Sequence, residues 1–415
     1  MSAEITFTDP EVQVCPFSAY HQARAEQPVY RDPVSGVFYV LDYKLTRAAA
    51  MDVERLSNQT GQLLVSPGPL AEQIMSIYRT KAIVPVDVLV AGDPPVHTLH
   101  RALVDKTFTI SRVKQMEDYL NEIVDRIIDR LDLEHEFEFM RDFAIGLPVA
   151  VIADQLGIPL EDRPQFKLWS IACVEAVSQN NDAAKHIELA NTVADFHKYI
   201  LDRAQMCLTE PDGSLLSDLV HSEVDGQRLG MAEVVSIVRQ MLNAGNETTT
   251  SVLGSGMLHL IEEPYLQDEL REHPELIPNF VEEVLRLESP LQGMFRRAKV
   301  DMELGGVAIP KDSLVFLRWG AANRDPAMFA NPDKLDLHRD HVRSHLTFGA
   351  GIHFCIGNQL ARRELCIAFE KLTKALCNMR LARGEASTVR KPHVFAYGLV
   401  ELHMRADRVP AVQMA

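Results

Sequence analysis

A short glycine-rich segment around one cysteine constrains this chain more than any other feature of its sequence. Residues 348–357 read FGAGIHFCIG and hold three glycines within nine residues. Glycines at this density indicate unusual backbone torsions or a partner that lies close against the main chain. Inward-pointing backbone N–H groups around Cys355 would spread the negative charge of a thiolate. A lone cysteine in a loop is more often inert, but the full pattern F-x-x-G-x-H-x-C-x-G favours a metal ligand.

Helical periodicity resumes directly after this segment and covers most of the chain. Cys355 is therefore expected just before a helix N-terminus, where partial positive charge favours the thiolate. Apolar residues spaced by three and four line one helix face over 113–131, and similar patterns cover about 184–206, 231–262 and 277–288. We predict a mainly α fold from this pattern.

Strand patterns are fewer and point to small, peripheral β-sheets. Residues 37–41 form a β-branched and aromatic run, and residues 302–310 read as a hairpin that turns on two glycines. Residues 56–92 show no clear period and are expected to form a long functional loop. No linker divides the chain, so residues 1–415 are predicted to form a single domain, in which 1–15 and 406–415 could be poorly ordered.

The charge balance argues against nucleic acid as a partner. Lys and Arg number 42 and Asp and Glu 58, which gives a net charge of −16 and a poor match for phosphate. No run of about 18 apolar residues is present, so no membrane span is expected. The first 17 residues lack Lys, Arg and an apolar signal-peptide core, which predicts a cytoplasmic location. The six cysteines form no C-x-x-C pair, which is typical of reduced thiols.

Three further segments carry informative patterns. Residues 244–249 read AGNETT, residues 283–286 read EVLR, and residues 93–98 read DPPVHT with an arginine at 101. Each alone has an ordinary explanation: a weak point in a buried helix, a surface ion pair, a surface cation. Taken in order with the cysteine segment, they make the chain resemble the haem-thiolate monooxygenases of the cytochrome P-450 family, in their soluble bacterial form, over nearly the whole length.

This resemblance implies a helical prism that binds haem b, iron protoporphyrin IX. Cys355 would be the axial iron ligand, because a thiolate donates electron density that assists O–O cleavage. Thr248 and Glu247 would be the catalytic residues, Thr248 facing O2 and Glu247 relaying protons from water. A local opening of their helix is expected to hold O2 and water. The residues implied to shape the haem cradle are Phe348, Gly349, Gly357, Ala244 and Gly245.

The resemblance also assigns roles to charged residues. Cations that would contact the haem propionates are His97, Arg101, Arg296 and His353, with His345 as a weaker candidate. Glu283 and Arg286 would form a buried structural ion pair, which the family completes with an arginine from a later segment. Lys334 stands in that segment here, although a lysine cannot make the forked contacts of a guanidinium.

The implied function is insertion of one oxygen atom from O2 into a small-to-medium apolar organic substrate. No dinucleotide-binding glycine fingerprint is present, so electrons must come from separate proteins, an iron–sulfur ferredoxin and its NAD(P)H-dependent reductase. Arg339, Arg343, Arg362 and Arg363, with Lys106 and Lys114, are expected to form a basic patch that docks the ferredoxin. The residues predicted to line the substrate pocket are Leu242, Leu291, Gln292, Met294 and Phe395, with Gln292 as a hydrogen-bonding anchor.

Other functions stay open on the sequence alone. A haem-thiolate isomerase, dehydratase or haem sensor would not need the proton relay of Glu247 and Thr248. A non-haem helical metal-binding or interaction protein would lack the red colour of haem. Zinc at Cys355 with His353 and His345 would lack a fourth ligand at a compact spacing.

Overall fold

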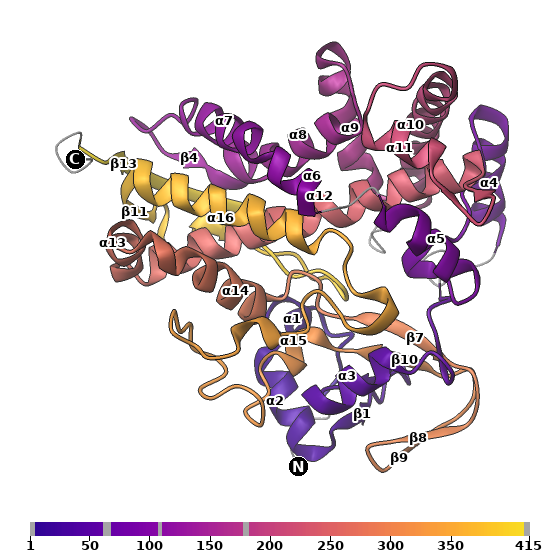
Figure 1. Cartoon of the computed structure of the whole chain (residues 1–415). Coiled ribbons are helices and arrows are strands. Elements are labelled where there is room, and N and C mark those ends of the chain that lie inside the picture. The colour runs from indigo at the N-terminus through magenta and orange to yellow at the C-terminus, as the bar shows by residue number, and fades with distance from the viewer. Residues whose placement is uncertain (1–4, 61–67, 107–109, 177–181, 411–415) are drawn as a thin grey trace. The chain divides into compact units, whose positions relative to one another are not determined.

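The computed structural model describes residues 5–60, 68–106, 110–176 and 182–410. The described chain is mainly helical with small sheets, as predicted (Figure 1). Its residues group into two compact units, each made of separate stretches of sequence. Unit 1 comprises Met1–Ser57, Val113–Leu147 and Thr248–Ala415, and unit 2 comprises Asn58–Arg112 and Pro148–Glu247.

Unit 1 is built around helix α16 (Asn358–Ala375), which begins three residues after Cys355. It packs against α7 (Glu117–Ile128), α13 (Tyr265–Glu272) and α14 (Ile277–Glu288) (Figure 1). The ring of Phe369 on α16 meets that of Phe280 on α14 edge-on, at 5.1 Å between centroids. The other helices of this unit are α1 (Pro10–Val14), α2 (Phe17–Glu26), α3 (Tyr43–Met51) and α15 (Trp319–Ala322).

A mixed five-stranded sheet in unit 1 has the strand order β1–β2–β10–β7–β3. Its strands are β1 (Val29–Arg31), β2 (Phe38–Val40), β3 (Leu56–Ser57), β7 (Met294–Ala298) and β10 (Leu314–Leu317). Strands β2 and β10 are parallel and the other neighbours antiparallel. The run predicted at 37–41 is thus confirmed as β2, and β7 places Met294 and Arg296 in the sheet.

Two smaller sheets complete unit 1. In the first, β13 (Glu401–Arg408) pairs with β11 (Leu376–Leu381), β12 (Thr388–Val389) and β4 (Phe137–Glu138). The second is the predicted hairpin of β8 (Met302–Leu304) and β9 (Val307–Ile309). Gly305 and Gly306 turn it at φ values of 59° and 79°, which explains the glycine pair.

Unit 2 is a helical group around α10 (Ala183–Thr209). This helix packs against α4 (Pro69–Lys81), α9 (Arg163–Glu175) and α11 (Leu215–His221). The unit also contains α5 (Val96–Asp105) and the short pair of β5 (Glu223–Val224) and β6 (Gln227–Arg228).

The prediction of a long functional loop over residues 56–92 was wrong for the part that α4 occupies. Apolar residues recur every fourth position there, at Leu70, Ile74 and Tyr78. Tyr78 is buried, and its ring stacks on His197 of α10 at 5.1 Å. The glycines and prolines before Pro69 hid this short period, while proline at the first helical position is favourable. Residues 61–67 lie outside the described residues.

Three helices run from one unit into the other: α6 (Ile110–Gln115), α8 (Gly146–Gln155) and α12 (Met231–Glu262). The single helix predicted over 113–131 is in fact α6 and α7, which separate at Met116. Glu117 and Asp118 open the first turn of α7, where acidic side chains stabilise a new N-terminus. The predicted helices at 231–262 and 277–288 are confirmed as α12 and α14.

Short helical turns connect these elements. They are the short π-helix η3 (Met140–Ala144) and the 3₁₀ helices η2 (Leu89–Ala91), η4 (Leu160–Asp162), η5 (Pro274–Leu276), η6 (Val342–Ser344), η7 (Gly351–His353) and η8 (Gly384–Ser387). Of the ends expected to be poorly ordered, residues 10–14 lie in α1 and residues 406–408 lie in β13, whereas 1–4 and 411–415 are not described. Across the described ranges, no helix is long and apolar enough to cross a membrane.

Candidate functional site

The segment around Cys355 forms a tight turn that ends at α16. The backbone N–H of Cys355 donates to the carbonyl of Phe348 at 2.9 Å, which closes the turn. Gly349 and Gly351 both have φ values of 73°, a region that disfavours side chains. A Cβ on Gly351 would also lie 2.9 Å from the carbonyl oxygen of Ala50. The glycines are therefore needed for the backbone to present Cys355 immediately before the helix.

Two side chains at the start of α16, Asn358 and Arg362, contact this turn and stabilise it. Asn358 donates from Nδ2 to the carbonyl of Cys355 at 2.7 Å and accepts from Arg362 at 2.9 Å. The guanidinium of Arg362 lies 4.3 Å from the ring centroid of Phe348. Sequence reasoning missed Asn358, although its place three residues after Cys355 could have indicated a backbone contact within the first helical turn.

Cys355 can be compared with two other cysteines, of which Cys173 is buried and Cys366, like Cys355, is half-buried. Burial raises the pKa of Cys173 and of Cys366 to about 11, which keeps these thiols neutral. Cys355 is half-buried, and its neighbours Ile352 and Phe354 expose their apolar side chains. A porphyrin supplies four nitrogens to iron and needs only an axial ligand from the protein. One accessible thiol in a fixed turn beside exposed apolar side chains fits that requirement.

The buried ion pair is present in unit 1 and has a third member that the sequence analysis misassigned. Arg286 donates from Nε and Nη2 to the two carboxylate oxygens of Glu283 at 2.6 and 3.0 Å, and both residues are fully buried. Arg339 donates from Nε to Glu283 at 2.9 Å. Lys334 contributes only its backbone carbonyl, which accepts from both arginines. The forked guanidinium of Arg339 reaches all these acceptors, as a lysine could not.

The residues expected at the haem propionates are divided between the units. Arg296 is buried on β7 and donates to the carbonyl of Phe295, and His353 is half-buried in η7 of unit 1. His97 and Arg101 stand one turn apart on α5 of unit 2. Burial, and secondly the charge of Arg101, lowers the pKa of His97, which favours its neutral form. Arg101 forms a 3.0 Å ion pair with Asp105.

His345 is not available as a propionate contact. Its Nε2 lies 2.8 Å from Oε2 of Glu282, and both side chains are buried. The backbone N–H of Thr347 donates to its other ring nitrogen at 3.3 Å. Both ring nitrogens are therefore already used inside unit 1, which corrects the sequence-based prediction.

Helix α12 carries the predicted oxygen-handling residues. Ala244 and Gly245 are exposed in the middle of this 32-residue helix, and beyond the neighbouring residues and the backbone of the helix itself no described atom lies within 4 Å of a Cβ built on Gly245. Burial raises the pKa of Glu247, and Thr248 is half-buried. The expected local opening is wrong, because every described residue of α12 from 231 to 262 is α-helical. Asn246, which the sequence analysis passed over, donates to Ser170 of α9.

The predicted substrate-pocket residues differ in how they are placed. In unit 1, Leu291, Met294 and Phe395 are half-buried. Gln292 is buried, and both ends of its amide are occupied by protein groups: Tyr20 donates to Oε1 at 2.7 Å, and Nε2 donates to the carbonyls of Glu288 and Ser289 at 2.8 Å each. The prediction that Gln292 hydrogen-bonds a substrate is therefore wrong.

Leu242 in unit 2 is likewise misassigned. Its side chain is fully buried and offers no surface to a ligand. It precedes Ala244 by two residues, which places it about 200° around the helix from that exposed position.

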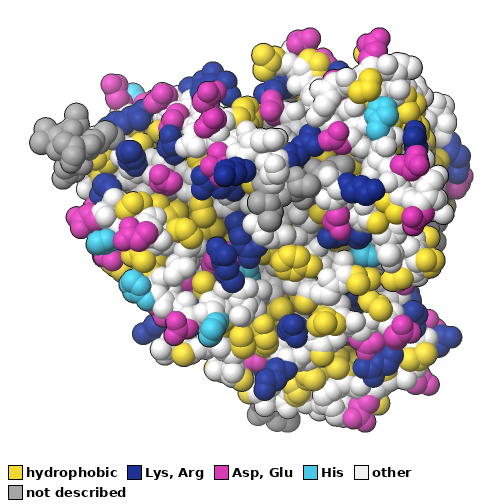
Figure 2. All heavy atoms as spheres, in the orientation of Figure 1, with side chains coloured by type: hydrophobic (Ala, Val, Ile, Leu, Met, Phe, Trp, Pro, Cys, Tyr) yellow, Lys and Arg dark blue, Asp and Glu magenta, His cyan; other side chains and the backbone are white. Residues whose placement is uncertain are grey.

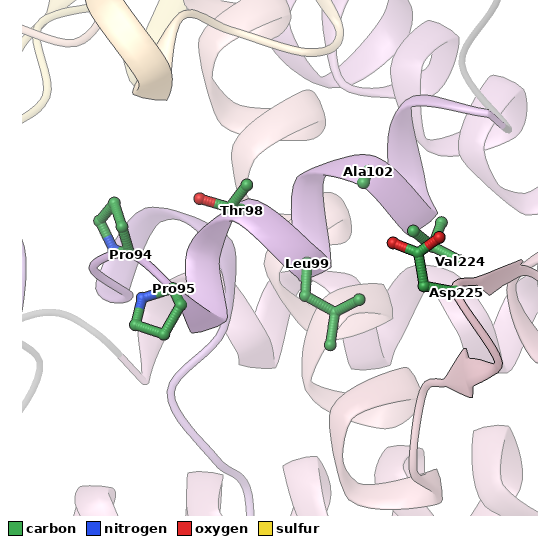
Figure 3. Close-up of a pocket in the computed structure, with 7 residues that line it drawn as sticks. All are labelled: Pro94, Pro95, Thr98, Leu99, Ala102, Val224 and Asp225. Carbon is green, nitrogen blue, oxygen red and sulfur yellow. The ribbon is translucent and has the colours of Figure 1, made fainter.

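Unit 2 also has an open groove of about 650 Å³ along α5 (Figure 3). The residues that line it are Pro94, Pro95, Thr98, Leu99, Ala102, Val224 and Asp225. None of the predicted site residues is among them. Across the described residues, no group of three or more His, Cys, Asp or Glu side chains is placed to hold a metal ion.

A mainly helical chain that presents one accessible cysteine from a glycine turn at a helix N-terminus has the architecture of a haem-thiolate protein. A family model described as Cytochrome P450 matches residues 165–376. The chain is 36% identical to the vitamin D(3) 25-hydroxylase of Pseudonocardia autotrophica, over 92% of each protein. It is 34% identical to the steroid C26-monooxygenase of Mycobacterium tuberculosis, over 92% of this chain and 91% of that one.

Solved structures agree with this similarity. The structure of cytochrome P450 CYP109Q5 from Chondromyces apiculatus matches with a TM-score of 0.87 at 33% identity, covering 99% of this chain and 100% of that one. The chain therefore belongs to the cytochrome P450 family. It is a monooxygenase that binds haem b.

Proposed function

We propose that this monooxygenase inserts one oxygen atom of O2 into a small-to-medium, largely apolar organic substrate, with Cys355 as the axial ligand of the haem iron. When bound, haem b supplies the oxygen-activating chemistry. The observation that carries this proposal is the closed turn that presents a half-buried Cys355 at the start of α16, in a chain of this family. Phe348, Gly349 and Gly357 shape the turn, and Arg296, His353, His97 and Arg101 provide positive charge or N–H donors for the haem propionates.

Ala244 and Gly245 support the same proposal from α12. Their exposure in the middle of a long helix leaves a flat stretch without side-chain bulk, which suits a planar macrocycle. Larger side chains at these positions would occupy that space. We therefore assign both residues to haem contact.

The substrate class is inferred from three residues predicted to line the substrate pocket and from the names of two relatives. Leu291, Met294 and Phe395 offer apolar, half-buried side chains, which favour a molecule with few polar groups. Two relatives are named for vitamin D(3) and for a steroid, both largely apolar molecules. Optical titration should show that steroid-sized apolar compounds shift the haem spectrum at micromolar concentration. Shifts produced only by small charged compounds would contradict this assignment.

Thr248→Ala is expected to separate reductant consumption from product formation. We place Thr248 beside O2, where its hydroxyl holds a proton donor in position for O–O cleavage. Without it, NAD(P)H consumption should continue, while a larger share of the electrons ends as hydrogen peroxide. Product, peroxide and NAD(P)H measured side by side test this expectation, and an unchanged ratio of product to NAD(P)H would refute it.

Glu247→Gln is expected to lower turnover by about tenfold or more, because the glutamine cannot carry a proton. Burial raises the pKa of Glu247, so its carboxyl stays protonated to higher pH than an exposed glutamate. Turnover of the parent should therefore fall as the pH rises through this raised pKa, and Glu247→Gln should lose that dependence. The rates are measured across pH in H2O and D2O, where a larger solvent isotope effect is expected for the variant. An unchanged rate and pH profile would rule out the relay.

The electron donor is proposed to be a small acidic ferredoxin that docks on cations near the Cys355 turn. The patch is smaller than the sequence suggested. Arg339 belongs to the buried ion pair, and Arg363 lies 3.1 Å from Glu117. Lys106, in unit 2, donates to the carbonyl of Glu223. Acidic and basic side chains are interspersed on the face drawn in Figure 2, so a docking site must be local.

Arg343 and Arg362, which surround Glu282, provide a local surplus of positive charge in unit 1. Arg343, Arg362 and His345 all share this one buried carboxylate. Burial acts to raise the pKa of Glu282, but hydrogen bonds from His345 and Arg362 outweigh it and lower the pKa to about 2. Two permanent cations thus face one anion, and the Arg343 side chain is 71% exposed.

Arg343→Glu is expected to slow reduction by the ferredoxin about tenfold at low salt, because complementary charge speeds association. The difference should shrink as salt screens the charges. Stopped-flow reduction at several ionic strengths measures it, with Arg380→Glu as the control, since Arg380 is an exposed arginine on β11. Equal rates for the two variants would contradict docking at Arg343.

A further inference from the structure

A buried hydrogen-bond network in unit 1 links helix α2 to the segment after α14. The hydroxyl of Tyr20 on α2 donates to Oε1 of Gln292 at 2.7 Å. The same hydroxyl accepts from Nε of Arg318 at 2.7 Å. All three side chains are buried, with exposed fractions of 0% to 1%. One phenol group therefore joins residues that are 272 and 298 positions away in sequence.

Arg318 is held without a carboxylate partner among the described residues. Its guanidinium lies 4.7 Å from the ring centroid of Phe316 and 5.2 Å from that of Tyr20. Its Nη1 donates to the carbonyl of Val394 at 2.6 Å. A buried cation that is stabilised by rings and neutral acceptors keeps a fixed geometry, because a lost hydrogen bond would leave charge unsatisfied.

This hydrogen-bond network lies beside two backbone segments that contain Leu291 and Phe395, two residues of the proposed substrate pocket. The N–H of Gln292 donates to the carbonyl of Phe395 at 2.6 Å, and the N–H of Tyr397 donates to the carbonyl of Pro290 at 2.9 Å. Leu291 and Ala396 form an antiparallel bridge between them. Leu291 and Phe395 thus belong to backbone segments that the hydrogen bonds of Gln292 and Arg318 hold in place, and the ring of Phe395 packs edge-on against Phe295 and Phe316 at 5.3 and 5.7 Å.

The residues packed against Gln292 and Gly293 leave no space for a larger side chain at two neighbouring glycines. A Cβ on Gly320 would lie 2.1 Å from Oε1 of Gln292, and a Cβ on Gly293 would lie 2.3 Å from the carbonyl oxygen of Leu317. Two glycines are therefore required for the segment to sit this close to β10 and α15. Because the packing is this close, the loss of a hydrogen bond from the Gln292 side chain should displace the backbone.

We propose that Tyr20, Gln292 and Arg318 act as positioning residues that set the place of Leu291 and Phe395 and thereby determine which carbon atom of the substrate is oxidised. The inference rests on the proposed function in one respect, that Leu291 and Phe395 face the substrate. None of the three side chains contacts the substrate. They act by fixing the positions of Leu291 and Phe395. The specificity of this enzyme thus depends on Tyr20 of helix α2, which is distant in sequence from the residues it positions.

The protonation of Tyr20 suits this role. Burial raises its pKa to about 12, although the nearby Arg318 acts to lower it. The phenol therefore keeps its proton at neutral pH and donates it to Gln292, while its oxygen accepts from Arg318.

The test compares Tyr20→Phe with Tyr39→Phe. Each variant removes one hydroxyl from the same buried aromatic cluster, and Arg318 lies near both rings, at 5.2 and 5.8 Å. Among the described contacts, only the Tyr20 hydroxyl bonds Gln292 and Arg318. Hydrogen exchange of the Gln292 and Tyr397 amides is measured in the intact holoenzyme, together with the ratio of oxidation products from one apolar substrate.

In Tyr20→Phe, exchange at both amides should be about tenfold faster, because Gln292 and Arg318 lose a buried partner. The ratio of products at different carbons should change by about threefold or more. Tyr39→Phe should leave both unchanged. Gln292→Met removes the same hydrogen bond from the other side and should shift both measurements in the same direction.

The two proposals can fail separately. Unchanged exchange and product ratio in whichever of Tyr20→Phe and Gln292→Met folds would overturn the positioning role, as would equal effects of Tyr39→Phe. Faster exchange without a change in product ratio would also overturn it, since the wall would move without affecting selectivity. If the parent forms no oxidised product, the proposed function fails, while the exchange data still decide whether the three residues hold the wall.

Discussion

Cys355→Ala is expected to remove the thiolate signature from the haem spectrum and to abolish oxygenation. The turn closed by Phe348 presents a single sulfur, and no other ligand atom in this turn donates comparable electron density. Cys355→His should retain some haem through its imidazole and still be inactive, because imidazole is the weaker donor. Spectra of the reduced variants and product formation measure the two effects separately.

Cys15→Ala provides the control for this experiment. Cys15 is an exposed thiol in unit 1, outside the turn, so its loss should leave the spectrum and activity unchanged. A thiolate spectrum that survives in Cys355→Ala would show that another cysteine binds the iron.

Arg286→Ala is expected to destabilise the protein by about 3–5 kcal/mol, because it leaves a fully buried Glu283 carboxylate with part of its partners removed. Glu283→Gln should act in the same direction, since two buried guanidinium groups then lose their counter-ion. Both variants should also retain less haem, because the ion pair joins α14 to the segment that leads to the Cys355 turn. Urea unfolding and haem content per chain are the measurements.

Lys334→Ala is the matched control for the ion pair. Only the backbone carbonyl of Lys334 is used, so removing its side chain should change stability by no more than about 0.5 kcal/mol. A large loss in Lys334→Ala would contradict the assignment of Arg339 as the third member, and a small loss in Arg286→Ala would contradict the importance of the Glu283–Arg286 pair.

Much of the helical framework could be predicted because its signals are local. The helices α12 and α14 and the turn before α16 follow from apolar spacing and from glycine density within short windows of sequence. The hairpin at Gly305 and Gly306 follows from its turn residues alone. The same holds for Cys355, whose glycines at 349 and 351 were visible signs of the left-handed backbone that the structure shows.

The misassigned residues depend on contacts between distant segments. Gln292 looks like a polar anchor in an apolar wall until Tyr20, 272 residues earlier, is seen to occupy its oxygen. His345 looks like a cation near the cysteine until Glu282 is found beside it. Arg339 was mistaken for a surface charge because nothing near it in sequence shows that its partner is Glu283. Side-chain partners of this kind have no local signal, whereas backbone conformation does.

Thiolate ligation of the haem iron is tested by the absorption spectrum of the reduced protein under carbon monoxide. Iron bound to the Cys355 thiolate should give a strongly red-shifted Soret band, and this band should be lost in Cys355→Ala. A Soret band without that shift in the freshly reduced, folded protein would contradict thiolate ligation by Cys355 and the monooxygenase function that depends on it.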